Sequence, residues 1–153
     1  MDKNGLITSS KSDIRTLAVD GLIFGLLSGL GMYLVMAILA LLSGNSAATL
    51  MERFSVSGSA SPIQGLLSHL AVSAIYGMLF GALIWPVVRR FSSAKLTGWL
   101  SGVGYALLLL FLAQVAILPG TNSPLAQLPF WEWALGHLAY GLILGVFFAR
   151  QTA

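Results

Sequence analysis

Residues 21–42 read GLIFGLLSGLGMYLVMAILALL, an apolar run that contains no charged side chain. Because an α-helix rises about 1.5 Å per residue, roughly 20 apolar residues cross the hydrocarbon core of a bilayer. Three further apolar runs of comparable length follow, at 66–88, 96–118 and 131–149. The sequence therefore predicts four membrane-spanning segments.

These segments are expected to be helices rather than strands. Strands of a transmembrane barrel alternate apolar and polar residues, whereas these runs are continuously apolar. A helix also satisfies its backbone hydrogen bonds within the segment, as lipid requires. Of the 153 residues, 57% are hydrophobic and 8% are charged, whereas soluble domains carry about 25% charged residues. A water-soluble monomer is thus excluded, and we predict a single all-α transmembrane domain over residues 1–153.

Positive charges mark one side of the predicted membrane. Lysine and arginine gather in the N-terminal segment 1–20, in the link 89–95 and at the C-terminal end. The loops 43–65 and 119–130 contain only Arg53. The positive-inside rule therefore places both termini and the 89–95 link in the cytoplasm, and we expect a multi-pass protein of a bacterial inner membrane. The net charge of +3 is too small to indicate nucleic-acid binding.

Some side chains are expected at the ends of the spans. Asp20 directly precedes the first apolar run, so its carboxylate is predicted to cap that helix. Residues 48–54 are predicted to form a short helix on the outer surface. Tryptophan is enriched at membrane interfaces. The expected interfacial residues are Trp85 and Trp99 on the inner side and Trp131 and Trp133 on the outer side.

The two halves of the chain resemble each other. LSGLG at 27–31 matches LSGVG at 100–104, and HLA at 69–71 matches HLA at 137–139. A Tyr-Gly-x-x-x-Gly string follows each HLA. We predict two tandem helical hairpins, a parallel internal repeat related by a pseudo-two-fold axis along the membrane normal.

Glycines at four-residue spacing are predicted to pack helices together. Small residues let helix backbones approach closely in lipid, where hydrophobicity does not sort helices. A flat cofactor against a glycine face is the alternative interpretation. The nine predicted packing glycines are Gly21, Gly25, Gly29, Gly77, Gly81, Gly98, Gly102, Gly141 and Gly145.

His69 and His137 are the main candidate binding residues, because ionisable side chains within a span usually face the bundle interior. In one interpretation, each imidazole bonds a backbone carbonyl or hydroxyl of a neighbouring helix. In another, the pair ligates haem b or another tetrapyrrole. In a third, the histidines line a path for protons, or a site for a quinone headgroup, together with Tyr76 and Tyr140.

Soluble-type catalysis is not indicated. The sequence lacks cysteine, and it contains no nucleophile–base pair, paired carboxylates, phosphate-binding loop or metal-ligand spacing. We therefore predict a non-enzymatic protein without a metal, and without a cofactor in the leading hypothesis. That hypothesis is an accessory or structural subunit that packs against other subunits of a respiratory or photosynthetic membrane complex. The alternatives are a tetrapyrrole-binding electron-transfer protein and a small transporter or proton-path protein, the last using Asp20 as well.

Two strings of the sequence carry a family resemblance: His69 followed by Tyr76-Gly77-x-x-x-Gly81, and LPFWEW at 128–133 leading into Gly136-His137-Leu138. In these strings the chain resembles the YagU-like and related families of small bacterial inner-membrane proteins of unknown function. It covers most of the second to fourth spans. The resemblance implies a four-span fold built from hairpins and assigns no activity, cofactor or catalytic residue.

Overall fold

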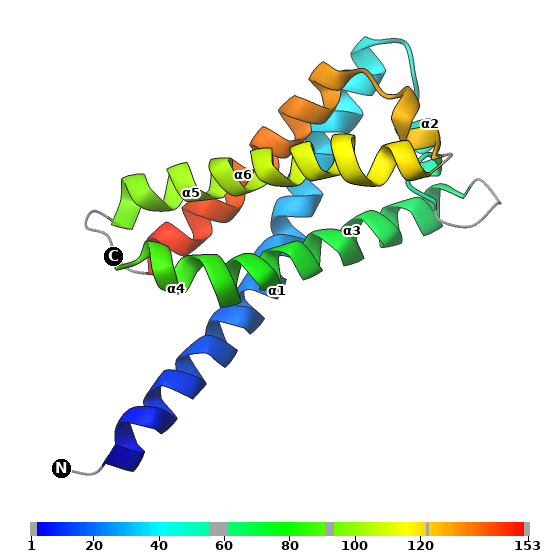
Figure 1. Cartoon of the computed structure of the whole chain (residues 1–153). Coiled ribbons are helices and arrows are strands. Elements are labelled where there is room, and N and C mark those ends of the chain that lie inside the picture. The colour runs from blue at the N-terminus through cyan, green and yellow to red at the C-terminus, as the bar shows by residue number, and fades with distance from the viewer. Residues whose placement is uncertain (1–2, 56–60, 91–93, 122, 152–153) are drawn as a thin grey trace.

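The structure, a computed structural model, describes residues 3–55, 61–90, 94–121 and 123–151, with side chains from Ile14 onward except at 94–95. Within these ranges the chain is helical and contains no strand (Figure 1). Four helical segments there are long and apolar enough to cross a membrane: Ile14–Leu42, Pro62–Val88, Leu96–Gly120 and Phe130–Gln151. The prediction of an all-helical chain with four helices long and apolar enough to cross a membrane is therefore confirmed for the described residues.

The first helix, α1 (Lys3–Leu42), begins well before the predicted start at Gly21. Its N-terminal part projects beyond the other helices (Figure 1). Asp20 lies inside this helix, so the prediction that it caps the helix is wrong. No proline precedes Asp20, and nothing in that segment stops the helix. The Asp20 carboxylate instead accepts a 2.8 Å hydrogen bond from Nε2 of Gln151 near the C-terminus.

The short helix α2 (Ala47–Glu52) forms close to the predicted position. The Ser46 hydroxyl caps it by accepting a 3.0 Å bond from the backbone N–H of Thr49. Its Leu50 and Met51 side chains are each only 2% exposed. The helix therefore inserts one face between α1 and the next span rather than lying wholly on the surface.

Two spans contain a wide helical turn that ends two residues before a proline. The second span runs through α3 (Pro62–Leu79), the π-helical η1 (Phe80–Ile84) and α4 (Trp85–Val88). The third comprises α5 (Ala94–Leu112), the π-helical η2 (Ala113–Ile117) and the 3₁₀ turn η3 (Leu118–Gly120). Pro86 and Pro119 lack a backbone N–H, and each wide turn accommodates that gap in the hydrogen-bond ladder. A further 3₁₀ turn, η4 (Pro124–Gln127), then leads to the last helix, α6 (Phe130–Gln151).

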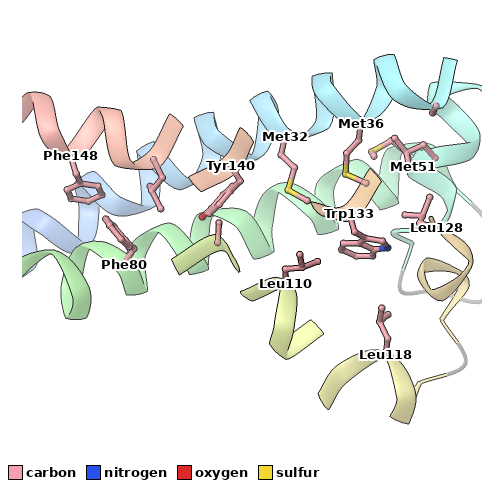
Figure 2. Packing of buried hydrophobic residues seen from close by; sticks show 14 of the residues in the cluster. Met32, Met36, Met51, Phe80, Leu110, Leu118, Leu128, Trp133, Tyr140 and Phe148 are labelled. Carbon is pink, nitrogen blue, oxygen red and sulfur yellow. The ribbon is translucent and has the colours of Figure 1, made fainter. Parts of the chain in front are cut away.

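The spans pack in two close pairs. α1 lies against α3, and α5 lies against α6. Contacts between α1 and α6 join the pairs, whereas α3 and α5 share few contacts. Figure 2 shows the buried core between them, with Phe80 and Phe148 at one end and Met36 and Trp133 toward the other. Phe80 and Phe148 are fully buried and their ring centroids lie 5.2 Å apart.

Glycines form the contact in both pairs. A Cβ atom added to Gly25 would lie 2.7 Å from the Cα of Gly77, and one added to Gly102 would lie 2.8 Å from the Cα of Gly145. The helices therefore approach backbone to backbone. All nine glycines assigned to packing lie at close contacts between helices, with Gly29 against the Ser73 side chain. Gly21, Gly25, Gly29, Gly77 and Gly81 lie between α1 and the second span (α3 and η1), and Gly98, Gly102, Gly141 and Gly145 lie between α5 and α6.

Candidate ligand-binding cleft

A cleft of about 800 Å³ lies between α3 and α5, which share few contacts. Its two walls are stripes of residues spaced four apart, which therefore share one face of each helix. On α3 the stripe consists of Ser68, Val72 and Tyr76, and on α5 and η2 it consists of Leu109, Ala113 and Ile117. The walls are mostly apolar, as small-molecule sites usually are.

The floor of the cleft comes from α6 and α1. Trp133, His137 and Tyr140 contribute from α6, and Met32 contributes from α1. Figure 2 shows Met32 pointing from α1 toward the side of α6 that carries Trp133 and Tyr140. At the end near α2, Glu52 and Arg53 also line the cleft, so its lining becomes charged there.

His69 is fixed by the close contact between α1 and α3. The side chain is 6% exposed, and its Nε2 lies 2.9 Å from the carbonyl oxygen of Gly29 on α1. A Cβ on Gly29 would collide with the Ser73 side chain, so the glycine permits the approach that brings its carbonyl within reach. The interpretation that each histidine bonds a neighbouring helix therefore describes His69.

His137 is held differently. It is 8% exposed, and its Nδ1 lies 2.9 Å from the carbonyl oxygen of Trp133, one turn earlier in the same helix. The expected bond to a neighbouring helix is thus replaced by a bond within α6. The other ring nitrogen of His137, Nε2, takes no part in that bond.

Aromatic side chains connect the two histidines. The ring of Phe54, just after α2, lies 5.0 Å from that of His69 and 6.0 Å from that of Trp133. The Trp133 ring lies 5.4 Å from that of His137. Sequence reasoning missed Phe54 altogether, because only the burial of α2 brings it to the cleft.

Two of the four predicted interfacial tryptophans are buried within the protein, so their indoles do not face lipid or water. Trp133 is 5% exposed, and its indole N–H donates a 3.2 Å bond to the Leu125 carbonyl. Trp85 is fully buried. Trp99 and Trp131, by contrast, are about half exposed. Helix rotation decides this difference, since Trp131 and Trp133 lie about 200° apart around α6.

Two tyrosine hydroxyls form hydrogen bonds that link α5 and α6 to α3. The Tyr140 hydroxyl donates a 2.8 Å bond to the Ser73 carbonyl and so links α6 to α3. The Tyr105 hydroxyl donates a 2.9 Å bond to the Tyr76 carbonyl and links α5 to α3. All four predicted binding residues, His69, His137, Tyr76 and Tyr140, therefore line one cleft.

Within the described part of the chain, Asp20 and Glu132 form no metal site and do not add to this cleft. No cluster of three or more histidine, cysteine or carboxylate side chains occurs in the ranges that the structure describes. Asp20 does not line the cleft. Glu132, in the first turn of α6, is 3% exposed and accepts a 3.4 Å bond from the Ser43 hydroxyl beside a smaller cavity of about 210 Å³.

Comparison of the chain with protein-family models, curated proteins and solved structures found no match.

Proposed function

We propose that this protein is a non-enzymatic membrane protein that holds one amphipathic molecule from the bilayer in the cleft between α3 and α5. The observation that supports the proposal is the cleft itself, which combines apolar walls with two buried imidazoles. Its volume of about 800 Å³ falls in the range of roughly 300–1,000 Å³ typical of small-molecule sites.

The opening of the cleft favours a ligand that arrives through the lipid. Val72 and Ile117 line opposite walls, yet they are 45% and 48% exposed. Both lie in spans long enough to cross a membrane, so we expect this exposed surface to face the bilayer. A ligand tail would leave between the two walls, and a polar end would lie toward Glu52 and Arg53.

Filling the cleft tests the proposal. Ala113 lines the cleft, whereas Ala116, in the same wide turn, is exposed and does not. We expect the protein, gently extracted from its own membrane, to carry an additional small-molecule mass in native mass spectrometry. Ala113→Trp should abolish that mass and Ala116→Trp should retain it. A 16.2 kDa chain that never carries a bound molecule, or two variants that behave alike, would contradict the proposal.

The role of an accessory subunit in a larger complex stays a prediction. Glycine faces free for contact with other subunits would favour this role, but these faces pack α1 on α3 and α5 on α6. The same native mass spectra would test it, because a stable subunit would remain with its partner polypeptides. A lone chain would oppose the hypothesis.

The two cofactor and transport alternatives have less support. A haem held by Nε2 of both histidines does not fit, because Nε2 of His69 bonds to Gly29. A Soret band lost in a double His→Ala variant would restore the haem hypothesis. A transport path through Asp20 would have to connect the cleft with the opposite end of the bundle, where Gln151 binds that carboxylate.

We further propose that the protein lies in a bacterial inner membrane with both termini in the cytoplasm. The arginine-rich end of α4 and the C-terminus lie at one end of the bundle, and α2 lies at the other (Figure 1). Because the chain lacks cysteine, single substitutions report orientation directly. In intact cells an impermeant maleimide should label Thr49→Cys and should not label Gln151→Cys.

The proposed repeat is supported by the equivalent positions of the two histidines. His69 precedes Gly77 by eight residues, and His137 precedes Gly145 by eight. Both glycines contact the preceding span in the same manner. We propose on this basis two tandem hairpins, and a relationship to the YagU-like families. Crosslinking of equivalent cysteine pairs in the two hairpins would test the symmetry.

A further inference from the structure

We infer that the cleft recognises a headgroup that donates two hydrogen bonds through hydroxyls, the chemistry of an aromatic diol such as a membrane quinol. This inference rests on the proposed function, since it names the class of ligand for the same cleft. It follows from the protonation that the hydrogen bonds impose on His69 and His137.

Both imidazoles are required to donate to the backbone. Nε2 of His69 lies 2.9 Å from the Gly29 carbonyl, and Nδ1 of His137 lies 2.9 Å from the Trp133 carbonyl. A carbonyl oxygen only accepts hydrogen bonds, so the nitrogen facing it carries the proton. Each ring is at least nine-tenths buried within a candidate span, where a charged side chain is costly. Each ring is therefore neutral.

The second nitrogen of each neutral ring has a lone pair and no proton. These atoms are Nδ1 of His69 and Nε2 of His137. Among the described side chains, neither atom has a hydrogen-bond partner. Neither is among the unpartnered polar atoms that are completely shielded from the surface. Both rings line the cleft, so a ligand in the cleft can reach these atoms. The cleft thus presents two hydrogen-bond acceptors.

The Tyr140 hydroxyl in the floor does not serve these acceptors. The Tyr140 O–H donates to the Ser73 carbonyl, so its only proton is already used. A ligand that itself only accepts, such as a quinone or an ester, would face two lone pairs. A ligand with two hydroxyl groups would satisfy both nitrogens, because a buried acceptor without a donor costs free energy.

The side chains between the histidines favour an aromatic ligand. Phe54 lies against His69 and Trp133 lies against His137, with 6.0 Å between the Phe54 and Trp133 ring centroids. Both rings line the cleft and offer faces or edges to a planar ring. A diol on a flat ring with an apolar tail therefore matches the acceptors, the aromatic cluster and the lateral opening together.

Nitrogen-15 NMR of the imidazoles tests the first step. The chain has only two histidines, so labelled histidine gives two ring systems in the full protein in nanodiscs. We expect both rings to be neutral, with the proton on Nε2 in His69 and on Nδ1 in His137. A charged ring, or a proton on Nε2 of His137, would overturn the inference.

Ligand binding tests the second step with three matched probes: decylhydroquinone, its dimethyl ether and decylbenzoquinone. The ether and the quinone retain the tail and the ring but lack the donors. We expect the diol to bind the wild-type protein at least about tenfold more tightly than either, and to shift the signals of the two unprotonated nitrogens. Equal or tighter binding of the ether or the quinone would refute the inference.

Variants separate the ligand class from the existence of the site. His137→Phe should reduce binding of the diol to the level of the ether, whereas Tyr33→Phe, outside the cleft, should not change it. If all three probes bind equally and Ala113→Trp blocks them all, the cleft binds ligands but the diol inference fails. If added Zn²⁺ shifts both bare nitrogens and excludes the diol, a metal site replaces the inference.

Discussion

Replacing Gly102 by alanine should push α5 away from α6, and the nearby Gly104 provides the control. A Cβ on Gly102 would collide with the Gly141 carbonyl oxygen and would lie 2.8 Å from both the Cα and the N of Gly145, whereas a Cβ on Gly104 would meet nothing within 4 Å. Backbone atoms cannot rotate out of the way, and carbon atoms prefer separations of about 3.5 Å or more. The contacts with Gly145 alone require α5 to move by at least roughly 0.7 Å, and overpacking of this kind costs about 1–3 kcal/mol.

The comparison isolates that steric cost. Both substitutions replace a glycine in the interior of α5, so both gain the same helix propensity, about 1 kcal/mol. Gly102→Ala should consequently be less stable than Gly104→Ala by about 1–3 kcal/mol. Unfolding by SDS in mixed micelles, followed by the fluorescence of the four tryptophans, measures this difference. If both variants unfold at the same SDS fraction, close backbone approach does not hold α5 on α6.

The same unfolding assay checks three further predictions. The Ser28 hydroxyl is fully buried without a partner, so Ser28→Ala should leave stability unchanged or raise it by about 1 kcal/mol; a clear loss would show that the hydroxyl is bonded. Tyr140→Phe removes the bond to the Ser73 carbonyl and should cost about 1 kcal/mol of stability. An unchanged stability would show that this bond does not contribute to holding α6 on α3. A Cβ on Gly136 would lie 2.8 Å from Cγ of Met36, a flexible side chain, so Gly136→Ala should cost less than Gly102→Ala, and an equal cost would contradict that distinction.

The spans were predictable because apolar length and glycine spacing are local properties of the sequence. The start of the first helix was not, because an aspartate before an apolar run looks like a cap whether or not the helix continues. Asp20 lies well inside α1, since no helix-breaking proline precedes it. Hydropathy marks where a helix enters lipid, and it does not mark where the helix begins.

The candidate site was predictable only in part. His69 and His137 could be selected because ionisable residues in spans usually face the interior. Phe54 could not, since its place at the cleft depends on the burial of α2 by Leu50 and Met51. The burial of Trp133 could not be predicted either, because residue type suggests an interface, whereas the rotation of α6 turns the indole toward the cleft.

The cleft follows from where the small residues are and where they are absent. Glycines bring α1 onto α3 and α5 onto α6, backbone against backbone. The facing stripes of α3 and α5 instead carry larger side chains such as Val72, Tyr76 and Leu109, so these two helices cannot approach as closely. A bulky residue at one of the close glycine contacts would strain the packing of the helices, whereas one at Ala113 would fill space that the fold already leaves open. The stability of the bundle and the shape of the binding site are therefore separable by substitution.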